Sequence, residues 1–351
     1  MTPLRFVVPA RGAGPSGGDV YDSHLARAWD AEHGRVDVLA LPGTWPRPGA
    51  TERHALALAL RTTGTVLLDG LVGSPCPEEV EHAVAAGARV VLLVHLPLPA
   101  EAGLPPREAE RLAGLESRTV RAASVVVTTS HWAAGDLVRR YGRDDVVVAV
   151  PGAVRGPAAT GSRPPHLLVL GALTAVKNHA VLVPALATLR DLPWQATFAG
   201  PTGAQPAVAG GVARALAKAG LAGRVDLPGS VTGADLEALW VRTDLLLVPS
   251  LVETYGLVVT EALARTVPAV VAAGTGAVEA LTGSPTPLPT DDVGPGAAVP
   301  PTDPAAWERV LHRWLTTPQL RAGWRAAAQV RREQLRTWAD TAADLRRGLL
   351  G

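Results

Sequence analysis

The sequence predicts an α/β protein with two doubly wound, mainly parallel sheets, each in its own domain. Its 351 residues exceed what one hydrophobic core usually organises. Short apolar runs alternate with amphipathic segments along most of the chain, which is typical of strands joined by crossover helices. A stretch rich in Pro and Gly, residues 151–165, separates two such series and is interpreted as the interdomain linker. We therefore expect a first domain over residues 1–160 and a second over 161–335.

The composition narrows the class of protein. No apolar run reaches the ~18 residues that a membrane span requires, and residues 1–10 lack the basic and long apolar regions of an export signal. We therefore expect a cytoplasmic protein without a transmembrane segment. The net charge of +1 gives no whole-protein field that would attract nucleic acid. Cys76 is the only cysteine, which excludes intrachain disulfides and cysteine metal clusters.

In the first half of the chain, strand ends supply candidate site residues. Because ligands bind beyond the carboxyl ends of parallel strands, Asp69, His95 and Ser130 become candidates. Ser130 is better interpreted as a helix cap, and a lone histidine at a strand end is more often structural. The expected strands are residues 5–9, 35–41, 65–69, 89–95, 124–129 and 145–150, with helices after Gly18 and near residues 51–62, 78–86, 106–122 and 130–141.

A glycine-containing loop, residues 10–18, joins the first strand to the first helix. Missing Cβ atoms let a backbone come close to phosphate, so Gly17 and Gly18 are candidates for such an approach. The Gly-x-Gly-x-x-Gly fingerprint of dinucleotide sites is absent in its usual register. From the residues alone, a surface loop is an equal interpretation.

The second half restarts the alternation and introduces one candidate cation. Lys177 precedes a predicted helix, residues 178–189, where its charge opposes the helix dipole and an anion would be favourable to both. A solvated loop lysine is the alternative. The other expected elements are strands at residues 166–171, 194–200 and 224–229, and helices near residues 204–219, 233–242, 304–315, 318–334 and 336–350.

Residues 244–273 form the stretch around which the second half is organised. Two apolar runs, 245–248 and 269–272, are too short for buried helices and predict strands, with a crossover helix over 257–265. Glu253 then lies in the loop beyond the first strand, and Glu261 lies in the helix, with seven residues between them. Two acceptors around a helix start suit a ligand that carries hydroxyl and phosphate groups.

The run from Ser250 to Ala262, Ser-Leu-Val-Glu-Thr-Tyr-Gly-Leu-Val-Val-Thr-Glu-Ala, resembles the signature of the family-four retaining glycosyltransferases of GT-B fold. Residues 273–281 and 298–306 resemble the usual continuation. The resemblance implies two Rossmann-like domains that face a cleft. The first, residues 1–160, would bind the acceptor and be joined by the C-terminal helix 336–351. The second, residues 161–335, would bind the nucleotide sugar.

The resemblance also implies roles for individual residues. Glu253 would hold the sugar hydroxyls, Glu261 the ribose and Lys177 the donor diphosphate, while His95 would point toward the transferred sugar. The family's loop reads Gly-Arg-x-x-x-x-Lys-Gly, whereas Ala172 stands here in the Arg position. The implied catalytic residues are His95, Lys177 and Glu253, and the implied donor-binding residues are Gly17, Gly18, Lys177, Gly200, Glu253, Thr254, Tyr255, Gly256, Leu257 and Glu261.

We therefore expect a retaining, hexosyltransferase-like enzyme with a nucleoside diphosphate sugar as co-substrate and no other cofactor. The chain has no Asp-x-Asp triplet and its nine histidines are scattered, so no metal is expected. The acceptor stays open among soluble sugars, small metabolites and lipid-linked glycans, and so does peripheral contact with a membrane. A sugar-nucleotide epimerase and a non-catalytic sugar-nucleotide-binding protein are the alternatives, the latter favoured by Ala172.

Overall fold

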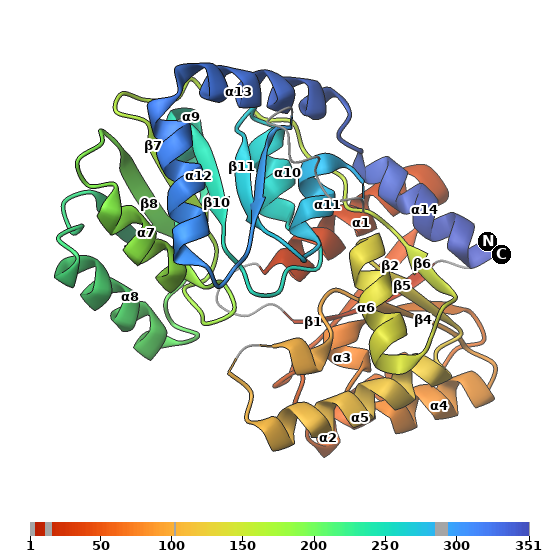
Figure 1. Cartoon of the computed structure of the whole chain (residues 1–351). Helices are drawn as coiled ribbons and strands as arrows, with labels where there is room; N and C mark the ends of the chain where they lie inside the picture. Colours follow the sequence, from red (N-terminus) through yellow and green to blue (C-terminus); the bar gives the residue numbers. More distant parts are fainter. Residues whose placement is uncertain (1–3, 11–15, 102, 285–293, 351) are drawn as a thin grey trace. The chain divides into compact units, whose positions relative to one another are not determined.

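The computed structural model describes residues 4–10, 16–101, 103–284 and 294–350 (Figure 1). The chain separates into two compact units, residues 1–152 with 336–351 (unit 1) and residues 153–335 (unit 2). Residues 153–160, which the sequence analysis placed in the first domain, belong to unit 2. The reason is backbone pairing: Ala159 N–H donates to Arg265 O at 2.8 Å and Thr160 N–H to Val241 O at 2.9 Å.

Unit 1 contains one parallel six-stranded sheet in the order β2-β1-β3-β4-β5-β6. Its strands are β1 (Leu4–Pro9), β2 (Val36–Leu41), β3 (Thr65–Asp69), β4 (Arg89–Val94), β5 (Val125–Thr128) and β6 (Val146–Val148). Its helices are α1 (Gly17–His33), α2 (Ala50–Ala59), α3 (Gly70–Gly73), α4 (Pro77–Ala85), η1 (Leu98–Ala100), α5 (Pro106–Ala122), α6 (His131–Tyr141) and α14 (Trp338–Leu350).

Two hydrophobic cores lie on the two faces of this sheet. Leu68 and Leu92 pack with α2, α4, α5 and α6, whereas Leu67 and Leu93 pack with α1 and α14. Successive strand side chains point to opposite faces, so a strand covered on both sides is apolar at every position. This explains why the central strands of unit 1 were predictable from continuous apolar runs.

Unit 2 repeats the architecture with a parallel sheet in the order β12-β11-β10-β7-β8-β9. Its strands are β7 (His166–Leu170), β8 (Gln195–Ala199), β9 (Val225–Gly229), β10 (Leu245–Val248), β11 (Ala269–Ala272) and β12 (Gly296–Val299). Its helices are η2 (His179–Val181), α7 (Leu182–Thr188), α8 (Pro206–Lys218), α9 (Gly233–Arg242), α10 (Leu257–Leu263), α11 (Ala277–Thr282), α12 (Pro304–Thr316) and α13 (Pro318–Glu333).

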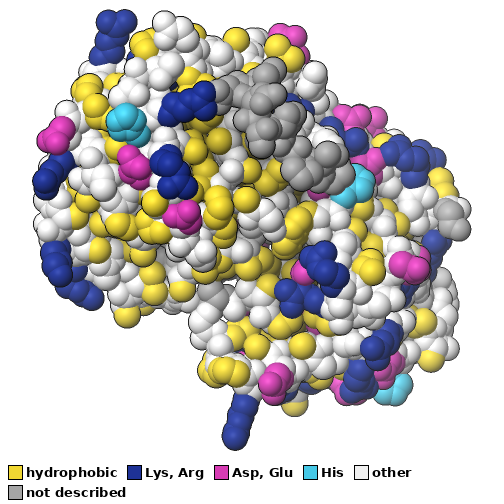
Figure 2. Space-filling model, viewed as in Figure 1, with side chains coloured by type: hydrophobic (Ala, Val, Ile, Leu, Met, Phe, Trp, Pro, Cys, Tyr) yellow, Lys and Arg dark blue, Asp and Glu magenta, His cyan; other side chains and the backbone are white. Residues whose placement is uncertain are grey.

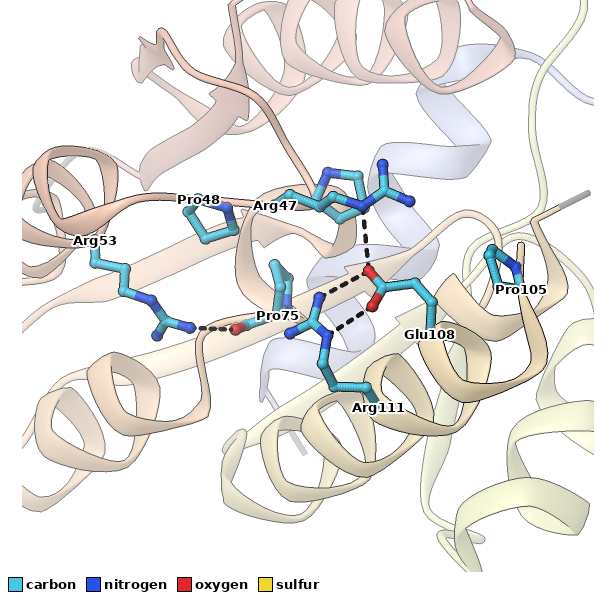
Figure 3. Close-up of a pocket in the computed structure, with 8 residues that line it drawn as sticks. Arg47, Pro48, Arg53, Pro75, Pro105, Glu108 and Arg111 are labelled. Carbon is cyan, nitrogen blue, oxygen red and sulfur yellow. Dashed lines mark hydrogen bonds and ion pairs between the residues drawn. The ribbon is translucent and has the colours of Figure 1, made fainter. Parts of the chain in front are cut away.

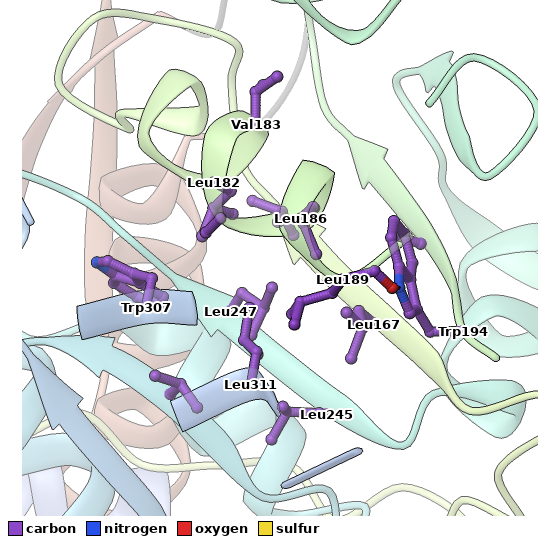
Figure 4. Close-up of a cluster of buried hydrophobic side chains, with 14 of the residues drawn as sticks. Leu167, Leu182, Val183, Leu186, Leu189, Trp194, Leu245, Leu247, Trp307 and Leu311 are labelled. Atoms are coloured by element: carbon purple, nitrogen blue, oxygen red, sulfur yellow. The ribbon is translucent and has the colours of Figure 1, made fainter. Parts of the chain in front are cut away.

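One core of unit 2 is built from β7, β10, α7 and α12 (Figure 4). Leu245 and Leu247 of β10 point to the same face as Leu167 of β7, and Trp307 and Leu311 of α12 cover them. These residues are fully buried. The core fixes the carboxyl ends of β7 and β10 side by side, which is where the loops with Lys177 and Glu253 begin.

Two local predictions differ from the structure. The helix expected over residues 178–189 begins later, because Asn178 adopts a left-handed backbone with φ 54°. Its side-chain Nδ2 donates to Pro249 O and Pro301 O. Asparagine tolerates this conformation better than most residues. A threonine directly before a helix is expected to cap it, but the side chain of Thr232, which precedes α9, caps no amide.

The surface carries mixed charge. Figure 2 shows basic and acidic side chains interspersed over the visible face, as the net charge of +1 leads one to expect. None of the helices in the described ranges combines the length and hydrophobicity needed to cross a bilayer.

Candidate functional site

An ion pair joins two loops at the carboxyl ends of adjacent strands in unit 2. Lys177 follows β7 and Glu253 follows β10, and these strands pair in parallel. The Lys177 Nζ lies 2.6 Å from Glu253 Oε2. Leu251 N–H also donates to Val176 O at 2.7 Å, which ties the two loops together. The structure therefore brings the predicted cation and the first predicted carboxylate into direct contact.

The space beside this pair is small. Gly171, Lys177, His179 and Glu253 help to line a cavity of about 10 Å³, which is room for roughly one water molecule. This cavity by itself is too small for a sugar nucleotide.

Glycines shape the loop that carries Glu253. Gly276 N–H donates to Glu253 O at 2.6 Å, and a Cβ at position 276 would lie 2.0 Å from Thr254 O. No side chain fits in that space, so the glycine lets the two loops touch. Gly256 has φ 89° and precedes α10, while Tyr255 is buried. The predicted residues 253–257 thus form one close-packed turn from loop into helix.

Glu261, on α10, has a perturbed carboxyl. Burial raises its pKa to about 7, an effect that the nearby Arg265 guanidinium only partly offsets. The guanidinium of Arg265 instead donates to the Glu237 carboxylate and to the backbone oxygen of Glu261. Within the described residues the Glu261 carboxylate accepts no hydrogen bond, so its oxygens remain available to a ligand hydroxyl.

In unit 1, His95 follows β4 and contacts two buried carboxylates. Its Nε2 lies 2.8 Å from Asp22 Oδ1 and 3.5 Å from Asp69 Oδ2. Asp69 was a candidate as a strand end, whereas Asp22 was not predicted from the sequence. The signal for Asp22 was an acidic residue on the inward face of α1, beside Tyr21 and three residues before Leu25.

Electrostatics determine where the protons of this cluster lie. Burial and the neighbouring Asp22 raise the pKa of Asp69 well above its usual range, whereas burial lowers the pKa of His95. A protonated Asp69 can share a hydrogen bond with ionised Asp22, which in turn accepts from a neutral imidazole. His95 Nδ1 has no hydrogen-bond partner among the described residues. The arrangement therefore favours a histidine that presents a lone pair at Nδ1.

Gly18 lies against the ring of His95. A Cβ at position 18 would be 3.2 Å from His95 Cδ2, so a side chain here would crowd the imidazole. Gly17 begins α1, and Ser16 and Asp19 close a capping box around its first turn. The structure thus places predicted residues Gly17 and Gly18 at the same end of unit 1 as His95; residues 11–15 of the predicted loop lie outside the described ranges.

The other predicted residues have structural explanations. A Cβ on Gly200 would lie 1.9 Å from Gly171 O, so the ends of β7 and β8 approach closely at this glycine. Ser130 caps α6 as expected, because its Oγ accepts from Ala133 N–H at 2.9 Å. Ala172 lies in the turn after β7, where Thr174 N–H donates to its carbonyl at 2.8 Å.

The chain is similar in sequence and in fold to known glycosyltransferases. Residues 155–331 match the family model described as glycosyl transferases group 1. The D-inositol 3-phosphate glycosyltransferase of Streptomyces scabiei is 33% identical over 264 residues, which cover 68% of this chain and 56% of that protein. The enzyme of the same name from Salinispora tropica is 31% identical over 271 residues, covering 70% and 54%. The chain spans just over half the length of these curated relatives.

Solved structures share the fold over the whole chain. Anabaena Alr3699/HepE in complex with UDP and glucose superposes with a TM-score of 0.75 and 18% identity, covering 99% of each chain. Sucrose-phosphate synthase from Thermosynechococcus elongatus gives a TM-score of 0.78 and 18% identity, covering 100% of this chain and 99% of the other. The predicted GT-B class, with two Rossmann-like sheets, is confirmed. With a family match over half of its length, the chain belongs to the group 1 glycosyl transferases.

Proposed function

We propose that the protein is a retaining glycosyltransferase that moves a hexose from a nucleoside diphosphate sugar to a small acceptor without a metal ion. The Lys177–Glu253 pair carries this proposal, because it sets a cation and a carboxylate at the carboxyl ends of adjacent strands. A solved neighbour was crystallised with UDP-glucose, which supports a donor of this class. Retention is carried over from the family that the sequence resembles.

Different residues would bind different parts of the donor. The diphosphate leaves with growing negative charge, which Lys177 would stabilise once it is released from Glu253. The Glu253 carboxylate would then accept hydrogen bonds from sugar hydroxyls. Glu261, whose carboxylate has no hydrogen-bond partner among the described residues, would accept from the ribose. Binding therefore exchanges one ion pair for two separate sets of ligand contacts.

His95 would contribute from unit 1. Asp22 and Asp69 hold its Nε2 side, so that Nδ1 can accept a hydrogen bond from a hydroxyl of the sugar or the acceptor. The two carboxylates are then positioning residues.

We also propose that the reaction takes place in the cytoplasm.

A thermal-shift panel of UDP-, GDP-, ADP- and dTDP-sugars tests the donor. A ligand at ~100 times its dissociation constant adds roughly 2.7 kcal/mol to the free energy of unfolding. We expect one class to stabilise the parental chain and Lys218→Ala, whose lysine is exposed on α8, but to stabilise Lys177→Ala less. If no nucleotide sugar stabilises the parental protein, the proposal is wrong.

Product analysis tests the chemistry. NMR of the glycoside formed with an active donor should show the anomeric configuration of the donor, and EDTA should leave the rate unchanged. An inverted product contradicts retention. Donor turnover that needs no acceptor would favour the epimerase instead.

A further inference from the structure

Unit 1 contains a carboxylate that is completely buried. Glu116 lies on α5, and its neighbours one turn away on this helix, Leu112 and Val120, are buried as well. An ionised carboxylate in apolar surroundings is costly unless hydrogen bonds compensate for the loss of water. The position of Glu116 is therefore to be explained by the groups that its carboxylate contacts.

The Glu116 carboxylate binds the main chain shortly after His95. The N–H of Leu98 donates to both carboxylate oxygens, at 3.1 Å to Oε2 and 3.3 Å to Oε1. Leu98 is the first residue of η1, and the first N–H groups of a helix have no partner within that helix. Glu116 supplies the missing acceptor from a different element of the fold.

The chain between this contact and the histidine is short and stiff. Only Leu96 and Pro97 separate His95 from Leu98. The ring of Pro97 restricts its φ, which is −56°. A displacement of Leu98 would therefore be passed on to His95, whose Nε2 lies 2.8 Å from Asp22 Oδ1.

Tyr141 contacts the same carboxylate from α6. Its hydroxyl donates to Glu116 Oε2 at 2.5 Å. Burial raises the pKa of Glu116, and the hydrogen bonds from Tyr141 and from Leu98 N–H oppose that rise. Hydrogen bonds to an ionised acceptor are among the stronger ones in proteins, so they offset part of the cost of burial.

The same face of α5 also contacts the segment that follows Asp69. The hydroxyl of Thr119, three residues after Glu116, donates to Ser74 O at 3.0 Å. Ser74 directly follows α3, and Asp69 caps the start of that short helix. Residues three apart lie on one face of a helix. One face of α5 therefore binds the main chain after both Asp69 and His95.

We propose that Glu116 is a positioning residue, which holds His95 in place by anchoring the main chain at Leu98. A buried carboxylate seldom adds net stability compared with a well-packed apolar side chain, so its benefit lies in the loop conformation that it fixes. The anchoring is argued from contacts within unit 1 alone. Its consequence for turnover rests on the proposed function, in which His95 contacts the sugar or the acceptor.

Two variants in one background isolate the contact with Leu98. Tyr141→Phe removes the tyrosine hydroxyl but leaves Glu116 as the acceptor. Adding Glu116→Leu to Tyr141→Phe removes that acceptor without leaving a buried hydroxyl unpartnered. Nitrogen-15 NMR of His95, assigned with His95→Asn, should show a protonated Nε2 in the parental chain and in Tyr141→Phe but both tautomers in the double variant. A parental spectrum in the folded double variant would overturn the proposal.

Turnover gives the second measurement, with the donor that stabilises the parental chain in the thermal-shift panel. The double variant should lose about tenfold or more, because a small misplacement of a site residue can cost up to about 100-fold. Tyr141→Phe should lose much less, and so should the control Glu110→Gln, which changes an exposed residue of α5. Equal losses in Tyr141→Phe and the double variant would mean that core packing, and not the anchor, sets the rate.

Two conservative variants separate the hydrogen bond from the charge. Glu116→Gln keeps an acceptor oxygen of the same reach, so the parental tautomer should persist. Glu116→Asp is shorter by one methylene, which withdraws the acceptor from Leu98, so both tautomers should appear even if the double variant does not fold. Mixed tautomers in Glu116→Gln, or the parental tautomer in Glu116→Asp, would contradict the anchoring.

The two measurements also distinguish this proposal from the proposed function. If the parental chain turns over no nucleotide sugar, the proposed function is wrong, whereas the NMR comparison still decides whether Glu116 positions His95. If the parental chain is active and the double variant keeps both its tautomer and its turnover, the role of Glu116 alone is rejected.

Discussion

The two units hold their charges in opposite ways. In unit 2, Lys177 and Glu253 neutralise each other at 2.6 Å beside a cavity of about 10 Å³. In unit 1, Arg47 and Arg111 share the carboxylate of Glu108 beside a pocket of about 550 Å³ (Figure 3), and Arg53, which also lines it, pairs with Glu78 and Glu79. A site that closes on its own ion pair requires a ligand that can replace both partners, as a sugar nucleotide does with phosphates and hydroxyls. In the pocket of unit 1, by contrast, one carboxylate is shared by two guanidinium groups.

The largest effect should come from breaking the pair in unit 2. Lys177→Ala removes the cation that faces the leaving diphosphate, so turnover should fall ~100-fold or more. The side chain is 32% exposed, and the melting temperature should change little. Steady-state kinetics compared with Lys218→Ala check this prediction. Parental turnover in Lys177→Ala would mean that another residue supplies the charge.

Glu253→Gln should sharpen the division of labour within unit 2. The amide keeps the size of the side chain but presents two donors where sugar hydroxyls need an acceptor. Turnover of the full donor should fall by about tenfold or more, while UDP binds as before. The measurement compares calorimetric UDP affinity with transfer rate in one folded variant. Equal losses of UDP affinity and transfer rate would show that Glu253 maintains the loop conformation and does not bind the sugar.

Much of unit 2 could be predicted from sequence because its signals are local. Strands β10 and β11 coincide with the apolar runs at 245–248 and 269–272, since both faces of each strand are buried. The glutamates and Lys177 lie in short segments that resemble a known pattern. Asn178 shows the limit, because its left-handed backbone depends on contacts with residues 249 and 301.

The sites of unit 1 could be predicted less well because they are assembled from distant segments. His95 is a visible strand end, but its partner Asp22 lies 73 residues earlier on the inner face of α1. Arg47 and Glu108 are 61 residues apart and meet only after β2 and β4 have joined the same sheet. Neither spacing has a period that a sequence pattern can reveal, so tertiary structure was needed.

A smaller effect should appear in the pH dependence of nucleotide binding. Ribose hydroxyls donate to the ionised Glu261 carboxylate, whose pKa is about 7, so UDP affinity should rise about tenfold between pH 6 and pH 8. Glu261→Gln should abolish that rise.

The same group affects stability. The pKa of Glu261 is raised in the folded state, so the stability contributed by its protonated form is lost as pH rises toward 7. Glu261→Gln should therefore also melt higher than the parental chain at pH 8. Calorimetry and thermal unfolding at both pH values test this, and a flat parental profile would remove Glu261 from the ribose site.

The smallest effect concerns the positioning of His95 in unit 1. Asp22→Asn replaces a charge-assisted hydrogen bond with a neutral one, so turnover should fall a few-fold, up to about tenfold. UDP affinity should not change, because Lys177 and Glu261, which we propose to hold the diphosphate and the ribose, lie in unit 2. The exposed Glu32→Gln on the same α1 is the control.

Nitrogen-15 NMR of the imidazole gives a readout that a merely structural role of Asp22 would not move. In the parental chain Nε2 should carry the proton and Nδ1 the lone pair. In Asp22→Asn the asparagine can donate as well as accept, so both tautomers should be populated and the pH profile of turnover should shift. An unchanged tautomer with reduced turnover would mean that Asp22 acts through the packing of α1. The contribution of His95 to turnover would then depend on how α1 packs against it, whereas the contribution proposed for Lys177 depends on its positive charge.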